Sequence, residues 1–463
     1  MINGYEASKG IGIGIAVILQ SSDVSGSDSM PGITSDILSG VKPGSVIVAR
    51  VLTPAAISML RDIKPAAIVC ETGGLTSHSA LVAKSFGIPA VYGAIGATDI
   101  IHEGDTVIVD GIRGFVYERP DNSLVEEFTA RKREFIKERT DLERFRGMKT
   151  KMADGSSAEI LCNVGDVVGV MNAIDNGAEG IGLYRTENYF SGMKNAPTED
   201  EQTANYSRVA RAMEGFEVVI RTLDIGGDKR LPFMPQEHEE NPFLGFRAIR
   251  YSLGNKPFFS TQLRAILRSA ASGNVSVLIP MVTCVEEIRE LRALIQELCS
   301  DMRDEGAVFN DDMKIGVMIE TPAAAEISDL LAGECDFFSI GTNDLVQYTM
   351  CADRGDGRLS YLQSVTQPPV LRLIERTIKN GLSAGISVSV CGEAASDPEI
   401  IPVLAGFGCR RFSVDPLSVP EVRRTLSEWT LKEAEELAME IMKMPSDHEI
   451  RQRLKSALKH GKA

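Results

Sequence analysis

The sequence predicts an α/β protein in which a small, strand-rich domain precedes a (β/α)8 barrel. Residues 1–119 contain short runs of β-branched and aromatic residues bounded by Gly, Pro or Asp, which indicates short strands with helices between them. Beyond residue 151, apolar runs alternate with stretches of helical periodicity. Eight such runs occur, at residues 159–163, 180–185, 218–224, 275–281, 315–320, 337–341, 387–391 and 411–414. Eight strands that alternate with helices are the pattern of a barrel.

The composition indicates a globular protein that is not a general binder of nucleic acids or anionic membranes. The 463 residues are 43% hydrophobic and 24% charged, and the formal net charge is −15. Nucleic acids and anionic membranes require a basic field, so an anionic substrate must be met by a local cluster of arginines. Eight cysteines occur without a Cys-x-x-Cys pair, which favours reduced thiols. Because a signal-peptide pattern and a run of about 18 apolar residues are both absent, we expect a soluble cytoplasmic protein.

One histidine lies in a turn with the features of an anion site. The apolar run 66–70 is followed by Gly73 and Gly74, and residues 80–84 have helical spacing, so His78 is expected at a helix N-terminus. Glycines allow the backbone to approach a ligand, and free amides with the helix dipole favour an anion. An imidazole so placed can accept a phosphoryl group. A capping turn with an incidental histidine is the competing interpretation, and the motif alone does not decide between the two.

The remaining segments define a linker, the barrel and a terminal helix. Residues 120–150 are rich in opposite charges three and four positions apart, which predicts a helical linker between the domains. The pattern fits a hinge arm and a solvated helix lying on a domain equally well. We expect the barrel at residues 151–445 and a C-terminal helix at 446–463.

Polar residues stand at the ends of most of the eight apolar runs. Sites in barrels lie beyond the C-terminal ends of the strands, so these side chains are expected to share one face. They are Asn163, Arg185, Arg221, Asp224, Glu320, Asn343, Asp344 and Cys391. A random set of strand ends would rarely collect arginines, carboxylates and a thiol, so we interpret this face as a catalytic site.

Several motifs resemble the family of phosphoenolpyruvate-utilising enzymes. Gly-Gly-Leu-Thr-Ser-His at 73–78, with Ala-Leu-Val-Ala-Lys at 80–84 and Ile-Pro-Ala-Val at 88–91, is similar to the phosphohistidine segment of that family. Within the family, the chain most resembles the enzyme I group of the bacterial phosphotransferase system. The resemblance implies that residues 1–119 form a swivelling phosphohistidine domain and that His78 carries the phosphoryl group.

Four arginine motifs also carry the resemblance. Phosphoenolpyruvate bears a phosphate and a carboxylate, and both match planar guanidinium groups. The implied substrate contacts are Arg185 in Gly-Leu-Tyr-Arg-Thr-Glu, Arg221 in Arg-Thr-Leu-Asp-Ile-Gly-Gly-Asp-Lys, Arg247 in Asn-Pro-Phe-Leu-Gly-Phe-Arg and Arg354 in Ala-Asp-Arg. Lys229 is implied as a further phosphate contact, and Asn343 as the residue that orients the phosphate.

The same resemblance assigns the metal ligands, the acid and the supports of the histidine. Glu320 and Asp344 match the family's metal ligands, and two carboxylates suit Mg²⁺, which keeps water or substrate oxygens in its other positions. Cys391, in Val-Cys-Gly-Glu-Ala-Ala, matches the donor that protonates the enolate of pyruvate, for which a thiol is competent. The implied supports of the phosphohistidine are Thr53, Thr76 and Lys84, the last at a position where arginine is usual.

One block of the enzyme I group is missing. The polar run 20–29 stands where those enzymes carry a helical subdomain that docks the histidine phosphocarrier protein, so we interpret that subdomain as absent near 20–40. The predicted function is still phosphorylation of His78 by phosphoenolpyruvate, release of pyruvate, and transfer to the phosphocarrier of the sugar phosphotransferase system by a homodimer. Two alternatives stay open: an enzyme similar to phosphoenolpyruvate synthase or dikinase with a separate nucleotide subunit, and a phosphoenolpyruvate-binding regulatory protein.

Overall fold

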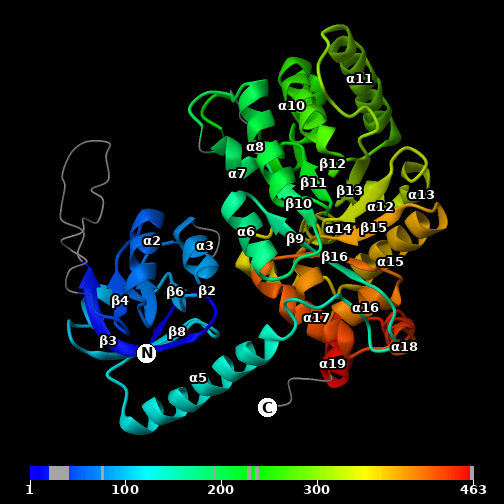
Figure 1. Ribbon diagram of the computed structural model, residues 1–463. Coiled ribbons are helices and arrows are strands. Elements are labelled where there is room, and N and C mark those ends of the chain that lie inside the picture. The colour runs from blue at the N-terminus through cyan, green and yellow to red at the C-terminus, as the bar shows by residue number, and fades with distance from the viewer. Residues whose placement is uncertain (20–40, 74–77, 192, 227–230, 235–238, 459–463) are drawn as a thin grey trace. The chain divides into compact units, whose positions relative to one another are not determined.

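The computed structural model describes the chain except for residues 20–40, 74–77, 192, 227–230, 235–238 and 459–463. The described residues form two compact units, unit 1 (residues 1–143) and unit 2 (residues 144–463) (Figure 1). Unit 1 is built on a mixed sheet, and unit 2 contains a closed barrel of eight parallel strands. The predicted α/β fold class is thereby confirmed.

Unit 1 is organised around one eight-stranded sheet in the order β1-β8-β7-β3-β4-β5-β6-β2. Its strands are β1 (Ile2–Asn3), β2 (Tyr5–Ser8), β3 (Ile11–Leu19), β4 (Val46–Ala49), β5 (Ala67–Cys70), β6 (Ala90–Tyr92), β7 (Thr106–Asp110) and β8 (Phe115–Glu118). Strands β3 to β6 run parallel, whereas β1, β2, β7 and β8 pair antiparallel with their neighbours. Its helices are α2 (Pro54–Ile63), α3 (His78–Ser85), α4 (Ala97–Ile100) and α5 (Asn122–Glu143).

The parallel strands of unit 1 are covered on both faces, which explains their continuous apolar sequence. In β5, Ile68 and Cys70 pack with residues of α2 and α3, and Ala67 and Val69 pack with residues of α4, β7 and β8. All four side chains are fully buried. Because successive residues of a strand point to opposite faces, a strand buried on both sides has no polar position. Residues 71–77 connect the carboxyl end of β5 to α3.

Helix α5 is fixed to the sheet of unit 1 by a small core and an ion pair. Phe128 is 2% exposed and packs with Ile11 and Ile108. Nη2 of Arg131 lies 3.0 Å from Oδ2 of the buried Asp110. These contacts hold the N-terminal half of the helix against its own unit.

Unit 2 is a closed parallel barrel surrounded by helices (Figure 1). Its strands are β9 (Glu159–Val164), β10 (Ile181–Arg185), β11 (Val218–Arg221), β12 (Val275–Ile279), β13 (Ile315–Ile319), β14 (Phe337–Ile340), β15 (Ser387–Val390) and β16 (Arg411–Val414). Each predicted apolar run coincides with one of these strands.

The helices of unit 2 follow the strands in alternation, with short 3₁₀ helices between some of them. The α-helices are α6 (Val167–Asp175), α7 (Glu187–Ser191), α8 (Glu199–Ala212), α9 (Ile249–Gly254), α10 (Lys256–Ser269), α11 (Val285–Asp304), α12 (Pro322–Glu326), α13 (Ser328–Leu331), α14 (Thr342–Met350), α15 (Pro368–Ser383), α16 (Ile401–Gly406), α17 (Val419–Ser427), α18 (Leu431–Ile441) and α19 (Asp447–Ala457). The 3₁₀ helices are η1 (Pro242–Leu244), η2 (Ala270–Ser272), η3 (Gly357–Leu362), η4 (Glu393–Ser396) and η5 (Pro416–Ser418). Of the helices described, none has the length and apolar character needed to cross a membrane.

The interior of the barrel is filled by side chains. A separate buried cluster contains Leu183, Val219, Leu278, Met318, Phe337 and Cys391. Met318 lies between Val317 and Ile319, which belong to the larger core around the strands. Because side chains alternate along a strand, the smaller cluster is the inner one. A filled interior leaves ligand space only beyond the strand ends.

Candidate functional site

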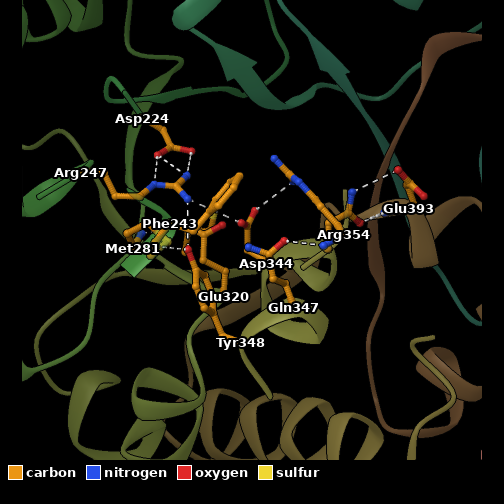
Figure 2. Close-up of polar contacts among 12 residues, drawn as sticks. Asp224, Phe243, Arg247, Met281, Glu320, Asp344, Gln347, Tyr348, Arg354 and Glu393 are labelled. Atoms are coloured by element: carbon orange, nitrogen blue, oxygen red, sulfur yellow. Dashed lines mark hydrogen bonds and ion pairs between the residues drawn. The ribbon is translucent and has the colours of Figure 1, made fainter. Parts of the chain in front are cut away.

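The predicted barrel residues lie at the C-terminal ends of the strands or in the loops that follow them. Strands β10 and β11 end at Arg185 and Arg221, and strands β13 and β15 are directly followed by Glu320 and Cys391. The first turn of α14 contains Asn343 and Asp344, and Arg354 follows this helix. Arg247 lies just before α9. Figure 2 shows Arg247, Asp344 and Arg354 turned toward one another, with Glu320 beside them. The polar residues that follow different strands therefore converge on one place.

Two arginines of the site are held by carboxylates. Nη2 of Arg247 donates to both carboxylate oxygens of Asp224, at 2.8 Å to Oδ1 and 3.0 Å to Oδ2. Arg221 lies 3.4 Å from Asp224 and donates to Glu187 at 2.9 Å. Arg221 and Arg247 are 6% and 3% exposed. Both guanidinium groups are therefore fixed in position by the protein itself.

The same carboxylates keep the two arginines charged despite burial. Desolvation by itself would lower the pKa of Arg221, but the negative charges of Glu187 and Asp224 outweigh it and raise the pKa. Desolvation also lowers the pKa of Arg247, but the charge and hydrogen bonds of Asp224, together with Tyr348 and Asp344, outweigh it and raise the pKa. An anion that enters this site meets permanently positive groups.

Glu320 is a buried carboxyl group beside these arginines. It is 1% exposed, and its Oε1 accepts a 2.7 Å hydrogen bond from the backbone N–H of Met281. Met281 has a φ of 60°, in the left-handed region that a methionine rarely adopts. Burial and the negative charge of Asp344 raise the pKa of Glu320 to about 8.

Asp344 lies between two arginines without a hydrogen bond to either. Its Oδ1 is 4.0 Å from Nη1 of Arg247, and its Oδ2 is 4.0 Å from Nη1 of Arg354 (Figure 2). The Oδ1 atom is buried and has no hydrogen-bond partner among the residues described. An unsatisfied carboxylate oxygen close to a second carboxyl group fits a cation site.

The donor set at this place is small. In the part of the chain that the structure describes, no three His, Cys, Asp or Glu side chains cluster at metal-binding spacing. Glu320 and Asp344 would thus supply two oxygen ligands and leave the other positions of an octahedral ion to water or substrate. This arrangement suits Mg²⁺ better than a metal that requires a closed protein cage.

Cys391 is a buried thiol that stays protonated at neutral pH. It is 3% exposed, and its Sγ lies 3.5 Å from the carbonyl oxygen of Ile340. Burial, with a contribution from the charge of Glu320, raises its pKa to about 11. Nδ2 of Asn163 donates to the carbonyl of Cys391 at 2.9 Å and fixes the backbone at this strand end. The thiol can therefore act as a proton donor at the inner edge of the site.

Arg185 and Arg354 are less strongly engaged than the other two arginines. The Arg185 side chain has accessible surface, although neighbouring residues crowd its guanidinium, and this group forms no hydrogen bond or ion pair with a described residue. Desolvation and the positive charge of Arg221 lower the pKa of Arg185. The guanidinium carbon of Arg354 lies 5.8 Å from the ring centroid of Phe243, and that of Arg247 lies 5.9 Å from the same ring. The guanidinium groups of Arg185 and Arg354 therefore have N–H donors available for an anion.

Sequence reasoning missed the residues that hold the predicted ones in place. Glu187 binds Arg221, and Glu393 exchanges two hydrogen bonds with Asn343, at 3.2 Å and 3.0 Å. Tyr348 accepts a 3.1 Å hydrogen bond from Arg247. Glu187 and Glu393 each stand two positions beyond a predicted residue at a strand end, so a search extended by two positions would have found both.

The predicted residues of unit 1 are only partly described. Oγ1 of Thr53 accepts a 3.2 Å hydrogen bond from the N–H of Ala56 and so caps α2. His78 is the first residue of α3, as the sequence predicts, and Lys84 is exposed in its last turn. Thr76, predicted as a support of the histidine, and Lys229, predicted as a phosphate contact, lie outside the described residues, as does the segment 20–40.

Two family matches cover most of the chain. Residues 139–431 match the family described as "PEP-utilising enzyme, PEP-binding domain", and residues 41–114 match "PEP-utilising enzyme, mobile domain". The first match covers unit 2 up to residue 431 and includes all the barrel residues discussed above. The second match spans Thr53, His78 and Lys84.

Curated relatives are about two fifths identical to this chain over the aligned residues. A phosphoenolpyruvate-protein phosphotransferase of Staphylococcus carnosus is 42% identical over 398 residues, which are 85% of this chain and 70% of the relative. The proteins of the same name from Haemophilus influenzae and Bacillus subtilis are 39% and 42% identical over 91% and 88% of this chain. The alignments cover 73% and 71% of those two relatives.

Proposed function

The chain belongs to the family of phosphoenolpyruvate-utilising enzymes, and we propose that it is a phosphoenolpyruvate-dependent protein phosphotransferase. It takes the phosphoryl group from phosphoenolpyruvate, releases pyruvate, and passes the phosphoryl group through a histidine to an acceptor protein. The observation that supports this most strongly is that four arginines, two carboxyl groups and a thiol lie at the C-terminal ends of the barrel strands or in the segments that follow them. These are the groups that an anionic phosphate ester and its enolate product require.

The arginines hold the substrate in this proposal. Arg221 and Arg247 keep fixed positions through Asp224 and Glu187, whereas Arg185 and Arg354 have donors to spare. We therefore assign the phosphate and carboxylate of phosphoenolpyruvate to these four guanidinium groups. Lys229 and Asn343 are assigned as further contacts of the phosphate. Binding by several planar forks orients the phosphorus for attack along one line.

Glu320 and Asp344 would hold a Mg²⁺ ion. The unsatisfied Oδ1 of Asp344 and the burial of Glu320 support this assignment. The ion would neutralise charge on the phosphoryl oxygens during transfer. The two carboxylates are held in place for this role, since Met281 donates to Glu320 and two arginines flank Asp344.

His78 accepts the phosphoryl group and Cys391 donates the proton in the proposed reaction. A ring nitrogen of His78 attacks phosphorus, so a nitrogen–phosphorus bond forms as the bond from phosphorus to the enol oxygen breaks. The resulting enolate takes the thiol proton of Cys391 on its methylene carbon and leaves as pyruvate. The thiolate then regains a proton from water. Thr53, Thr76 and Lys84 are assigned as supports of the phosphorylated imidazole.

The acceptor is proposed to be a phosphocarrier protein, because the relatives are named as protein phosphotransferases. We propose that the helical subdomain for carrier docking is missing near residues 20–40, so other residues of the chain would contact the carrier. The homodimer expected from the resemblance stays a prediction.

A labelling experiment tests the proposal. Phosphoenolpyruvate labelled in its phosphate should place acid-labile label on the wild-type chain and none on His78→Ala. His102→Ala is the matched control, because His102 is an exposed histidine of the same unit, 3.6 Å from Asp105. Absence of label on the wild-type chain, or equal labelling of both variants, would contradict the proposal. Label that stays on the chain when histidine phosphocarrier protein is added would leave self-phosphorylation standing and refute the assigned acceptor.

A further inference from the structure

Unit 1 contains a cavity of about 350 Å³ that His78 does not line. Its walls come from the loops that precede β3, β4, β5 and β6 and from one face of α5. These four strands run parallel, so the cavity lies at their amino ends. His78 follows the carboxyl end of β5 and therefore lies on the side of the sheet where the parallel strands end, opposite the cavity.

Helix α5 contributes a continuous stripe to the cavity. Lys132, Phe135, Ile136 and Arg139 line it, and their spacing of three, four and seven residues places them on one face of the helix. A Cβ atom at Gly87 would lie 3.5 Å from Nη1 of Arg139. The guanidinium of Arg139 therefore reaches across from the helix to the loop before β6.

Four cations surround the cavity without carboxylate partners. Lys9 and Lys64 come from the loops, and Lys132 and Arg139 come from the helix. None of the four forms an ion pair or a side-chain hydrogen bond with any residue in the described part of the chain. In a chain with 64 acidic and 49 basic residues, four unpaired cations at one place create a local positive field that favours an anion.

The walls between these cations are apolar. Phe135 is half-buried, and Ile136 is 52% exposed at the rim. A Cβ atom at Gly10 would lie 3.6 Å from the ring of Phe135 and 2.8 Å from Pro89, so this glycine leaves the space open. A cavity with apolar walls and a few charged groups is the usual form of a small-molecule site.

We propose that this cavity binds a small organic anion, one with a phosphate, sulfonate or carboxylate group attached to an apolar or aromatic body. The charged group is held by Lys9, Lys64, Lys132 and Arg139, and the apolar body lies against Phe135 and Ile136. The site is distinct from the phosphotransfer machinery, and its occupancy does not depend on the proposed reaction.

The experiment uses the full chain and the fluorescent probe 8-anilinonaphthalene-1-sulfonate. We expect saturable binding that weakens by about tenfold or more in Lys132→Glu with Arg139→Glu, because two charge-assisted contacts are reversed. The matched control is Arg133→Glu with Lys137→Glu, which changes the net charge equally on exposed positions of the same helix that do not line the cavity. The control should bind the probe as the wild-type chain does. N-phenyl-1-naphthylamine, which has the same rings without the sulfonate, should bind at least about tenfold more weakly.

Three results would overturn the proposal. They are the absence of saturable binding to the wild-type chain, equal affinity of the two double variants, and equal affinity for the charged and uncharged probes. Circular dichroism checks that the variants remain folded. Lys9→Glu reverses a charge on the opposite wall of the cavity. If the helix variant unfolds, this variant replaces it in the affinity measurement, and an unchanged affinity for the sulfonate probe would then overturn the proposal. Labelling of His78 by phosphoenolpyruvate should persist in all these variants, because none of the changed residues belongs to the phosphotransfer site.

Discussion

Arg247 and Asp224 form a buried, two-pronged ion pair, with Nη2 at 2.8 Å and 3.0 Å from the two carboxylate oxygens. The same carboxylate lies 3.4 Å from Nη1 of Arg221. One aspartate therefore balances two guanidinium groups inside the site. Its removal would leave both arginines buried with less compensating charge.

We expect Asp224→Asn to lower the free energy of unfolding of unit 2 by about 3–5 kcal/mol, because it breaks a buried ion pair on one side. Asp200→Asn is the control, since Asp200 is 84% exposed and pairs with Arg268 at the surface. That change should cost about 1 kcal/mol or less. Urea unfolding of both variants measures the difference, and equal losses would show that the pair is not energetically important.

Cys391→Ser should lower kcat for pyruvate release by about 10²- to 10⁴-fold, the usual contribution of a positioned general acid. A serine hydroxyl is a much weaker acid than a thiol, whereas the size of the side chain changes little. Cys409→Ser is the control, because Cys409 is also a buried thiol but belongs to the outer core. The KM for phosphoenolpyruvate should change little in both variants. A normal kcat in Cys391→Ser would refute the assignment of this thiol as the acid.

Removal of divalent cations with a chelator should abolish labelling by phosphoenolpyruvate, and added Mg²⁺ should restore it. Asp344→Asn should raise the Mg²⁺ concentration for half-maximal labelling by about tenfold or more, because one of two ligand carboxylates is lost. Asp336→Asn is the control at the other end of the barrel, where Asp336 precedes β14 and accepts from the N–H of Ile315 at 2.7 Å. An unchanged Mg²⁺ requirement in Asp344→Asn would remove Asp344 from the ligand set.

Alkaline pH should destabilise the protein through its buried thiols. Burial raises the pKa of Cys409 from 9.0 to about 11, so this thiol is protonated in both states below pH 9. Between these two values the unfolded chain has released the proton and the folded chain has not, so the free energy of unfolding falls as pH rises. The slope for one such group is about 1.4 kcal/mol per pH unit. Denaturation under reducing conditions at pH 8, 9 and 10 should show a shallower decline in Cys409→Ala than in the wild-type chain, and parallel declines would contradict the shift.

The barrel strands were predictable because burial on both faces leaves an apolar run that ends in a polar residue. Arg221, Glu320 and Cys391 stand directly at such boundaries, and the structure places them at one end of the barrel. Arg247 does not stand at the end of an apolar run, so only the resemblance to the phosphoenolpyruvate-utilising enzymes identified it as a candidate. Its pairing with Asp224, 23 positions earlier, produces no periodicity in the sequence.

The cavity of unit 1 was not predictable from the sequence for a related reason. Its cationic residues come from three separate parts of the chain, at Lys9, at Lys64 and at Lys132 with Arg139. Only Lys132 and Arg139 share a pattern, and the charged stretch that contains them indicates an exposed helix equally well. The convergence depends on how α5 packs on the sheet, which is a property of the folded unit.

Cys391 belongs both to the cluster that fills the barrel and to the group of side chains above it. The acid of the proposed reaction is thus part of the packed cluster inside the barrel. Local unfolding around Cys391 would have to disrupt this cluster, so we expect the thiol to lose its position only when the barrel unfolds. Heat inactivation of pyruvate release should consequently coincide with melting of the barrel and show no earlier phase.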